Sequence, residues 1–293
     1  MPSLKDVKLQ IAGVGKTKQI TRAMGMVASS KLRGAQARIE RFRPYAEKFG
    51  QMLGDLAART DGAAHPLLQV HDKPKITVIL LVSSDRGLCG GFNVNLISAA
   101  QKLAQAREAE GRTVRFLCVG RKARDAVRKS SWELIEAIPD VMGSFNFQLA
   151  AHLGNRVSQL YTSGDADEVY LVYSEFVSMS RQVATTMPLL PVVPTCGEED
   201  GNTPGATEYT YEPKVEVLLS ELLPRYVNVQ IYRGLLDTSA SENAARMAAM
   251  DNATRNCDEL IDSLTLLYNK TRQASITNDL MDIVGGANAL QSQ

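Results

Sequence analysis

The chain has few of the residues that build metal centres and catalytic sites. Its 293 residues include four cysteines and three histidines, with no CxxC pair and no spacing that joins the two types in a ligand set. There is no GxSxG motif, and no serine or cysteine has a histidine close to it in sequence. We therefore expect no catalytic residue, no metal site and no cofactor, and the scattered cysteines are typical of reduced thiols in the cytosol.

Long hydrophobic runs are also missing. The longest apolar run, Ile76–Val82, is far too short to span a bilayer, and the N-terminal MPSLKDVK lacks the apolar core of a signal peptide. At 44% apolar residues, however, the chain has ample material for a folded core. We expect a soluble or peripheral protein without direct membrane insertion.

The net charge of +1 hides a basic N-terminal segment. The first fifty residues carry eleven Lys and Arg residues against only Asp6, Glu40 and Glu47. Such a segment suits an acidic protein partner, although an ordinary solvated helix face is the simpler interpretation. A nucleic-acid face would need aromatic residues or a recognised reading motif among the basic ones, and the segment has neither. We therefore expect no nucleic-acid partner.

Apolar residues recur at alternating steps of three and four from Leu4 to Leu56, which is the pattern of a coiled-coil seam. Lys18, Thr21 and Gly25 alone interrupt the series. Pro44 is expected to kink the helix or to mark a join, because proline removes a backbone donor and crowds the preceding turn.

The middle of the chain alternates apolar strands with helical segments. This order predicts a mostly parallel, Rossmann-like α/β sheet, with an edge strand at 181–193 where prolines are tolerated. The expected strands are Lys75–Ser83, Thr113–Val119 and Glu168–Phe176, and the expected helices are Asn93–Glu110, Lys122–Ser130 and Phe147–Ser163.

Helical periodicity returns after Pro213 and runs to the C-terminus, with one expected interruption at Pro224 and a small-residue tip at Gly285–Ala289. We expect Thr60–Gly62 to end the first helix and the acidic, Gly-rich segment Gly197–Thr207 to be an exposed loop. The predicted fold class is thus α/β: a long antiparallel coiled coil of the two terminal helices plus a Rossmann-like domain. The predicted divisions are an N-terminal helix over 1–59, the α/β domain over 60–212 and a C-terminal helix over 213–293.

Two Gly-rich motifs invite a phosphate-binding interpretation. Gly13–Thr17 resembles the end of a Walker A loop, but Gln10 replaces the first glycine and no strand precedes the motif. Ser84–Asn93 joins a strand to a helix, where dinucleotide phosphates sit, but its spacing is not GxGxxG. A structural turn is the favoured interpretation of Ser84–Asn93, and a nucleotide-binding enzyme remains the alternative.

Three blocks resemble the γ subunit family of the F-type ATP synthases, and the similarity runs nearly end to end. The blocks are Lys18–Arg33 (KQITRAMGMVASSKLR), Ser84–Asn93 (SDRGLCGGFN) and Ser241–Ala289, which contains YNKTRQASIT. The resemblance implies a noncatalytic rotor subunit that couples proton-driven rotation of a membrane ring to ATP synthesis or hydrolysis. The implied partners are the ring of α and β subunits, the ε subunit and the ring of c subunits. The implied location is the cytoplasmic side of a bacterial inner membrane, as a peripheral protein.

The resemblance also implies a set of rotor–stator contact residues, none of which is expected to do chemistry. Two departures from the family pattern stand out: Asp279 replaces the usual glutamate with a shorter carboxylate, and Gly25 occupies a position where many relatives carry a charge. The regulatory insert with a cysteine pair, found in chloroplast relatives, is absent. The implied contact residues are Lys18, Arg22, Met24, Arg86, Arg272, Gln273, Thr277, Asp279 and Asp282.

Overall fold

The computed structural model describes residues 3–58, 65–71, 73–192 and 215–291. The chain divides into two compact units, one formed by residues 1–28 with 247–293 and the other by residues 29–246. Each unit is described on its own below.

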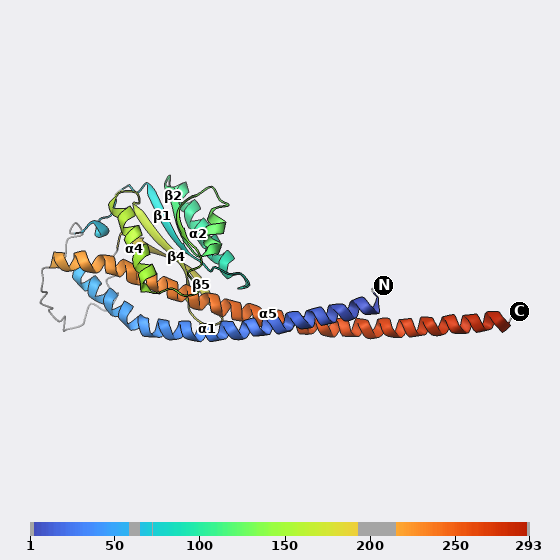
Figure 1. Ribbon diagram of the computed structural model, residues 1–293. Helices are drawn as coiled ribbons and strands as arrows, with labels where there is room; N and C mark the ends of the chain where they lie inside the picture. The colour runs from blue at the N-terminus through green and yellow to red at the C-terminus, as the bar shows by residue number, and fades with distance from the viewer. Residues whose placement is uncertain (1–2, 59–64, 72, 193–214, 292–293) are drawn as a thin grey trace, which may run out of the picture. The chain divides into compact units, whose positions relative to one another are not determined.

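Two long helices run through the sequence at either side of the sheet-forming segment: α1 (Leu4–Ala58) and α5 (Val215–Gln291) (Figure 1). The predicted interruption at Pro224 is wrong, because α5 continues through that residue, and Pro44 likewise lies inside α1 and marks no join. Tertiary packing offsets the lost backbone bond near Pro224, where the neighbouring Leu223 and Val227 are fully buried. The helix also continues through Gly285–Gly286. The predicted stop at Thr60–Gly62, Pro213 and the predicted loop at 197–207 lie outside the described residues.

The unit of residues 29–246 contains a five-stranded sheet in the order β3-β2-β1-β4-β5. The first four strands are parallel, and β5 is an antiparallel edge strand, which confirms the predicted α/β build. The strands are β1 (Ile76–Val82), β2 (Thr113–Val119), β3 (Glu133–Ile138), β4 (Glu168–Phe176) and β5 (Gln182–Leu190). The remaining helices are η1 (Pro66–Leu68, 3-10), α2 (Phe92–Ala109), α3 (Arg121–Val127) and α4 (Phe147–Thr162).

Alternating side chains of the strands pack on the two faces of the sheet. On one face, Ile79 and Leu81 of β1 join Phe92 and Leu96 of α2 in the main core cluster. On the other face α5 comes so close to β4 that a Cβ added at Gly234 would lie 2.9 Å from Leu171 Cδ2. Helices α2 and α4 thus cover opposite faces of the sheet (Figure 1), and α5 packs on β4.

Strand β3 was not predicted from the sequence. Its segment ELIEAI is short and carries Glu133 and Glu136, and it forms the edge of the sheet beside β2. A half-exposed edge strand needs neither an unbroken apolar run nor strict alternation, so the pattern that identified β1, β2 and β4 is absent here.

Candidate functional site

The helix pair of residues 3–28 and 247–291 accounts for all three interruptions of the apolar seam. Lys18 forms an ion pair with Asp258. The Thr21 and Thr254 hydroxyl oxygens lie 2.8 Å apart and share a hydrogen bond. A Cβ added at Gly25 would lie 3.6 Å from Met250 Cβ, so the glycine sits against the opposite helix.

These three contacts define an antiparallel pairing. The forward steps of three and four residues along α1 (18, 21, 25) are matched by two backward steps of four residues along α5 (258, 254, 250). The seam is closed at Val7, Thr21 and Ala28, all of which are at least nine-tenths buried. The polar positions are therefore built into the helix interface as matched pairs, which can set the register of two helices.

Residues 272–285 of α5 are almost entirely exposed within this unit. They carry large apolar side chains with exposed fractions between 52% and 69%, namely Ile276, Leu280, Met281, Ile283 and Val284. Five predicted contact residues lie in the same stretch and are all exposed: Arg272, Gln273, Thr277, Asp279 and Asp282. Apolar surface of this extent on a helix is typical of an interaction site.

The other predicted contact residues have different surroundings. Arg22 is exposed and Met24 is half-buried on α1, in the same unit as the C-terminal stretch. Lys18 is engaged by Asp258. Arg86 is exposed but belongs to the other unit, in the Gly-rich turn.

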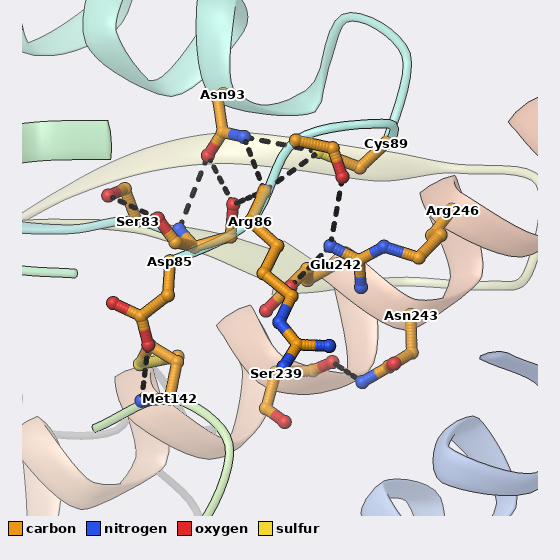
Figure 2. Close-up of polar contacts among 12 residues, drawn as sticks. Ser83, Asp85, Arg86, Cys89, Asn93, Met142, Ser239, Glu242, Asn243 and Arg246 are labelled. Atoms are coloured by element: carbon orange, nitrogen blue, oxygen red, sulfur yellow. Dashed lines mark hydrogen bonds and ion pairs between the residues drawn. The ribbon is translucent and has the colours of Figure 1, made fainter. Parts of the chain in front are cut away.

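In the unit of residues 29–246, the turn Ser84–Asn93 is held by a network of its own polar groups (Figure 2). The Asn93 amide oxygen accepts hydrogen bonds from the Ser84 backbone N–H (3.2 Å) and from the Ser84 hydroxyl (2.9 Å). The Asn93 amide nitrogen donates to Cys89 Sγ (3.1 Å). Leu88 and Gly90 adopt positive φ angles of 61° and 58°, which lets the chain turn tightly between β1 and α2.

Asp85 links this turn to two other segments at the carboxyl ends of the strands. Its carboxylate accepts backbone N–H bonds from Arg121 (2.9 Å), Asp140 (2.7 Å) and Met142 (2.9 Å). Arg121 begins α3, so the carboxylate also meets the positive end of that helix. The aspartate of SDRGLCG therefore acts as a structural anchor.

Helix α5 fastens the same turn from the other side. Arg246 Nη2 donates to the Gly87 carbonyl (3.3 Å) and pairs with Glu242 (2.6 Å), with both charged side chains largely buried (Figure 2). Burial raises the pKa of Glu242, while Arg246 opposes that shift. The Gly-rich turn and the segment 241–246 of α5 are thus in direct contact.

Sequence reasoning missed the buried polar stretch of α5. Two side chains of this stretch bond to the backbone of Ser174 on β4. The Thr238 hydroxyl oxygen accepts a hydrogen bond from the Ser174 N–H (3.2 Å), and the Ser241 hydroxyl donates one to the Ser174 carbonyl (3.2 Å). Ser174 lies beyond the part of β4 that pairs with β1, so α5 takes over its backbone bonds. The sequence signal that could have revealed this stretch is DTSASEN (residues 237–243), a run of mostly small polar residues within a predicted helix.

The geometry of the turn gives little support to phosphate binding. The Arg86 carbonyl accepts a hydrogen bond from within the turn, and the Gly87 carbonyl accepts one from Arg246 of α5. The side chains of Ser84 and Asn93 are hydrogen-bonded to each other, so neither is directed at a ligand. Cys89 is buried, and burial raises the pKa of its thiol, which disfavours the thiolate that a nucleophile needs. Among the described residues no group of three or more His, Cys, Asp or Glu could hold a metal ion. No helix in that part of the chain has a stretch suited to crossing a membrane.

Comparison with known proteins decides the family. A family model described as ATP synthase matches residues 3–290. The ATP synthase gamma chain of Nitratidesulfovibrio vulgaris strain Hildenborough is 66% identical over 291 residues, which cover 99% of this chain and 100% of that one. The chain belongs to the ATP synthase gamma chain family. The gamma chain of Maridesulfovibrio salexigens is 59% identical with the same coverage.

Solved structures agree with this membership. The chain is similar to the central stalk and c-ring structure of Tetrahymena thermophila mitochondrial ATP synthase, with 27% identity and a TM-score of 0.60 over 80% of this chain and 99% of that one. A Euglena gracilis mitochondrial ATP synthase chain, at 19% identity and a TM-score of 0.70 over 99% and 95% of the two chains, shares the fold. As a gamma chain, the protein is a subunit of an ATPase complex.

Proposed function

We propose that this gamma chain is the central-stalk rotor of a bacterial F1Fo ATP synthase and is itself noncatalytic. In this role its helices turn within the ring of α and β subunits, and its α/β domain joins the ε subunit and the c-subunit ring. Rotation of an asymmetric surface changes the affinity of each β site in turn, which couples proton flow to ATP synthesis or hydrolysis. The complex places the chain at the cytoplasmic side of the inner membrane as a peripheral subunit.

The observation that carries the proposal is the C-terminal stretch of α5. A helix of this length that leaves residues 272–285 almost entirely exposed, with five large apolar side chains among them, needs another protein to cover it. The rest of the same unit is a matched antiparallel pair, as a stiff rod requires. Family membership supplies the protein that covers the exposed end, namely the catalytic ring.

We propose that the rotor meets the ring through the contact residues expected from the family motifs. Seven of these residues are exposed in their own units, which favours this role: Arg22, Arg86, Arg272, Gln273, Thr277, Asp279 and Asp282. Lys18 acts through its pair with Asp258, and Met24 through a half-buried side chain. The segments 1–59 and 213–293 serve as the rotor helices, and 60–212 serves as the joining domain.

Reconstitution tests the proposal directly. The purified chain, mixed with α and β subunits, should co-purify with them and raise their ATPase rate. A chain that neither assembles with the ring nor changes its rate would contradict the rotor role.

The alternative is a nucleotide-binding enzyme that uses the turn at Gly87–Gly91. Equilibrium dialysis of the isolated chain against ATP and NAD separates the two, because the rotor predicts no specific binding of either. The saturated polar network of Ser84 and Asn93 favours the rotor.

A further inference from the structure

A narrow groove between α1 and α5 in the unit of residues 29–246 contains a buried carboxylate. Asp237 is only 4% exposed, and most of the surrounding wall is apolar. The residues that line the groove are Ile39, Phe42, Arg43, Ala46, Arg233, Leu236 and Asp237.

The cations around Asp237 offset only part of the cost of burying its negative charge. The closest cation, Arg233 one turn earlier on α5, has its Nε 3.8 Å from Asp237 Oδ2, which is longer than a hydrogen bond, and its side chain is 47% exposed. Arg43 of α1 lines the same groove. Tyr173 and Glu175 of β4 face it from the sheet, and Glu175 adds a like charge.

We propose that this groove is a proton-binding site, in which Asp237 takes up a proton as the surroundings acidify and the packing of α1, α5 and β4 becomes stronger. A neutral carboxylic acid fits apolar walls better than a carboxylate whose cations lie at a distance. The site does not depend on the proposed rotor function, because it rests only on contacts within one unit.

The direction of the effect follows from the two states of Asp237. Burial is the main cause that raises the pKa of Asp237 to about 6. The positive charges of Arg233 and Arg43 lower this pKa, and the negative charge of Glu175 raises it. In the unfolded chain the pKa returns to the ordinary value of 3.8. Because the folded chain holds the proton more tightly, this residue makes the fold more stable as the pH falls from about 7 to about 4, and stability is lost as the pH rises through about 6.

Thermal unfolding of the full chain between about pH 4.5 and 8 tests the site. Asp237→Asn mimics the protonated acid, so it should raise Tm by a few degrees at pH 7.5 and should remove part of the rise in Tm that the wild-type chain shows on acidification. Asp251→Asn is the matched control. Asp251 pairs with Arg255 at the same i, i+4 spacing, at 3.0 Å, but both side chains are 67% exposed. This variant should leave the pH profile unchanged.

A second variant keeps the test decisive if Asp237→Asn folds poorly. Arg43 is exposed and lowers the pKa of Asp237, so Arg43→Gln should move the acid-induced rise in Tm to higher pH. The carboxyl carbon of Asp237, followed by NMR in wild-type protein with labelled aspartate, should titrate near pH 6. A titration near pH 4, or Asp237→Asn and Arg43→Gln profiles that match wild type, would overturn the proposal.

Discussion

At the scale of single residues, the glycine with the least room for a side chain among the described residues is Gly154, where α4 meets α5. A Cβ added at Gly154 would lie 1.8 Å from Asn228 Oδ1, an atom that is buried and has no hydrogen-bond partner among the described residues. Glycine is therefore required by the helix crossing itself, and not by a special backbone angle.

We expect Gly154→Ala to lower the free energy of unfolding by about 1–3 kcal/mol, because the added methyl group must push Asn228 or its helix away. Urea unfolding measures the change. Gly34→Ala is the matched control, since Gly34 is exposed within α1 with open space around it, and should raise stability by up to about 1 kcal/mol. The double variant Gly154→Ala, Asn228→Ala should recover part of the loss; equal losses in the single and double variants would show that the contact is not the cause.

Asp85 is the second residue on which a single substitution has a large predicted effect. Its removal in Asp85→Ala leaves the backbone N–H groups of Arg121, Asp140 and Met142 without their acceptor, at a cost of about 3 kcal/mol or more. Urea unfolding again gives the value. The exposed Asp165→Ala should change stability by less than about 0.5 kcal/mol, and a similarly small loss for Asp85→Ala would refute the anchoring role.

At the scale of helices and strands, the central feature is the register of α1 against α5 in the unit of residues 3–28 and 247–291. The paired hydroxyls of Thr21 and Thr254 report it most directly, because they lie on facing helices 2.8 Å apart. The same pairing predicts that Thr265 lies about three turns away from Thr21 along α5.

We therefore expect Thr21→Cys with Thr254→Cys to form a disulfide under mild oxidation, in a background where the native cysteines are replaced by serine. Thr21→Cys with Thr265→Cys should stay reduced, since the two positions are too far apart for the geometry of a disulfide. Non-reducing gel electrophoresis distinguishes the pairs, and cross-linking of the second pair in preference to the first would mean that the register is different.

Periodicity was sufficient to predict the long helices, the strands β1, β2 and β4 and the edge strand β5, because each has a strong local pattern. It could not supply the partners of Lys18, Thr21 and Gly25, since Thr21 and Thr254 are 233 positions apart in sequence. It also missed β3, whose charged edge segment lacks the pattern, and overstated the effect of Pro224, which packing around Leu223 and Val227 overrides. Periodicity could not reveal the roles of Thr238 and Ser241 either, because both bond to Ser174 of β4, which is far away in sequence.

At the scale of the whole molecule, the three sequence blocks have three different roles. Lys18–Arg33 contributes the polar pairs at the interface of α1 with α5, and Ser84–Asn93 forms a turn that Asp85 and Arg246 tie to neighbouring segments. The last block ends in exposed apolar surface. We propose that all three blocks serve a subunit that works through its shape.

If this chain is a rotor, it turns relative to the α and β subunits during ATP hydrolysis, and single-molecule observation of the assembled complex measures this rotation. The chain, assembled with α and β subunits that are fixed to a surface, would carry a probe on a cysteine introduced at the exposed Ser163 at the end of α4. On addition of ATP the probe should turn in one direction. Full ATPase activity with a probe that stays still would show that the chain is not a rotor.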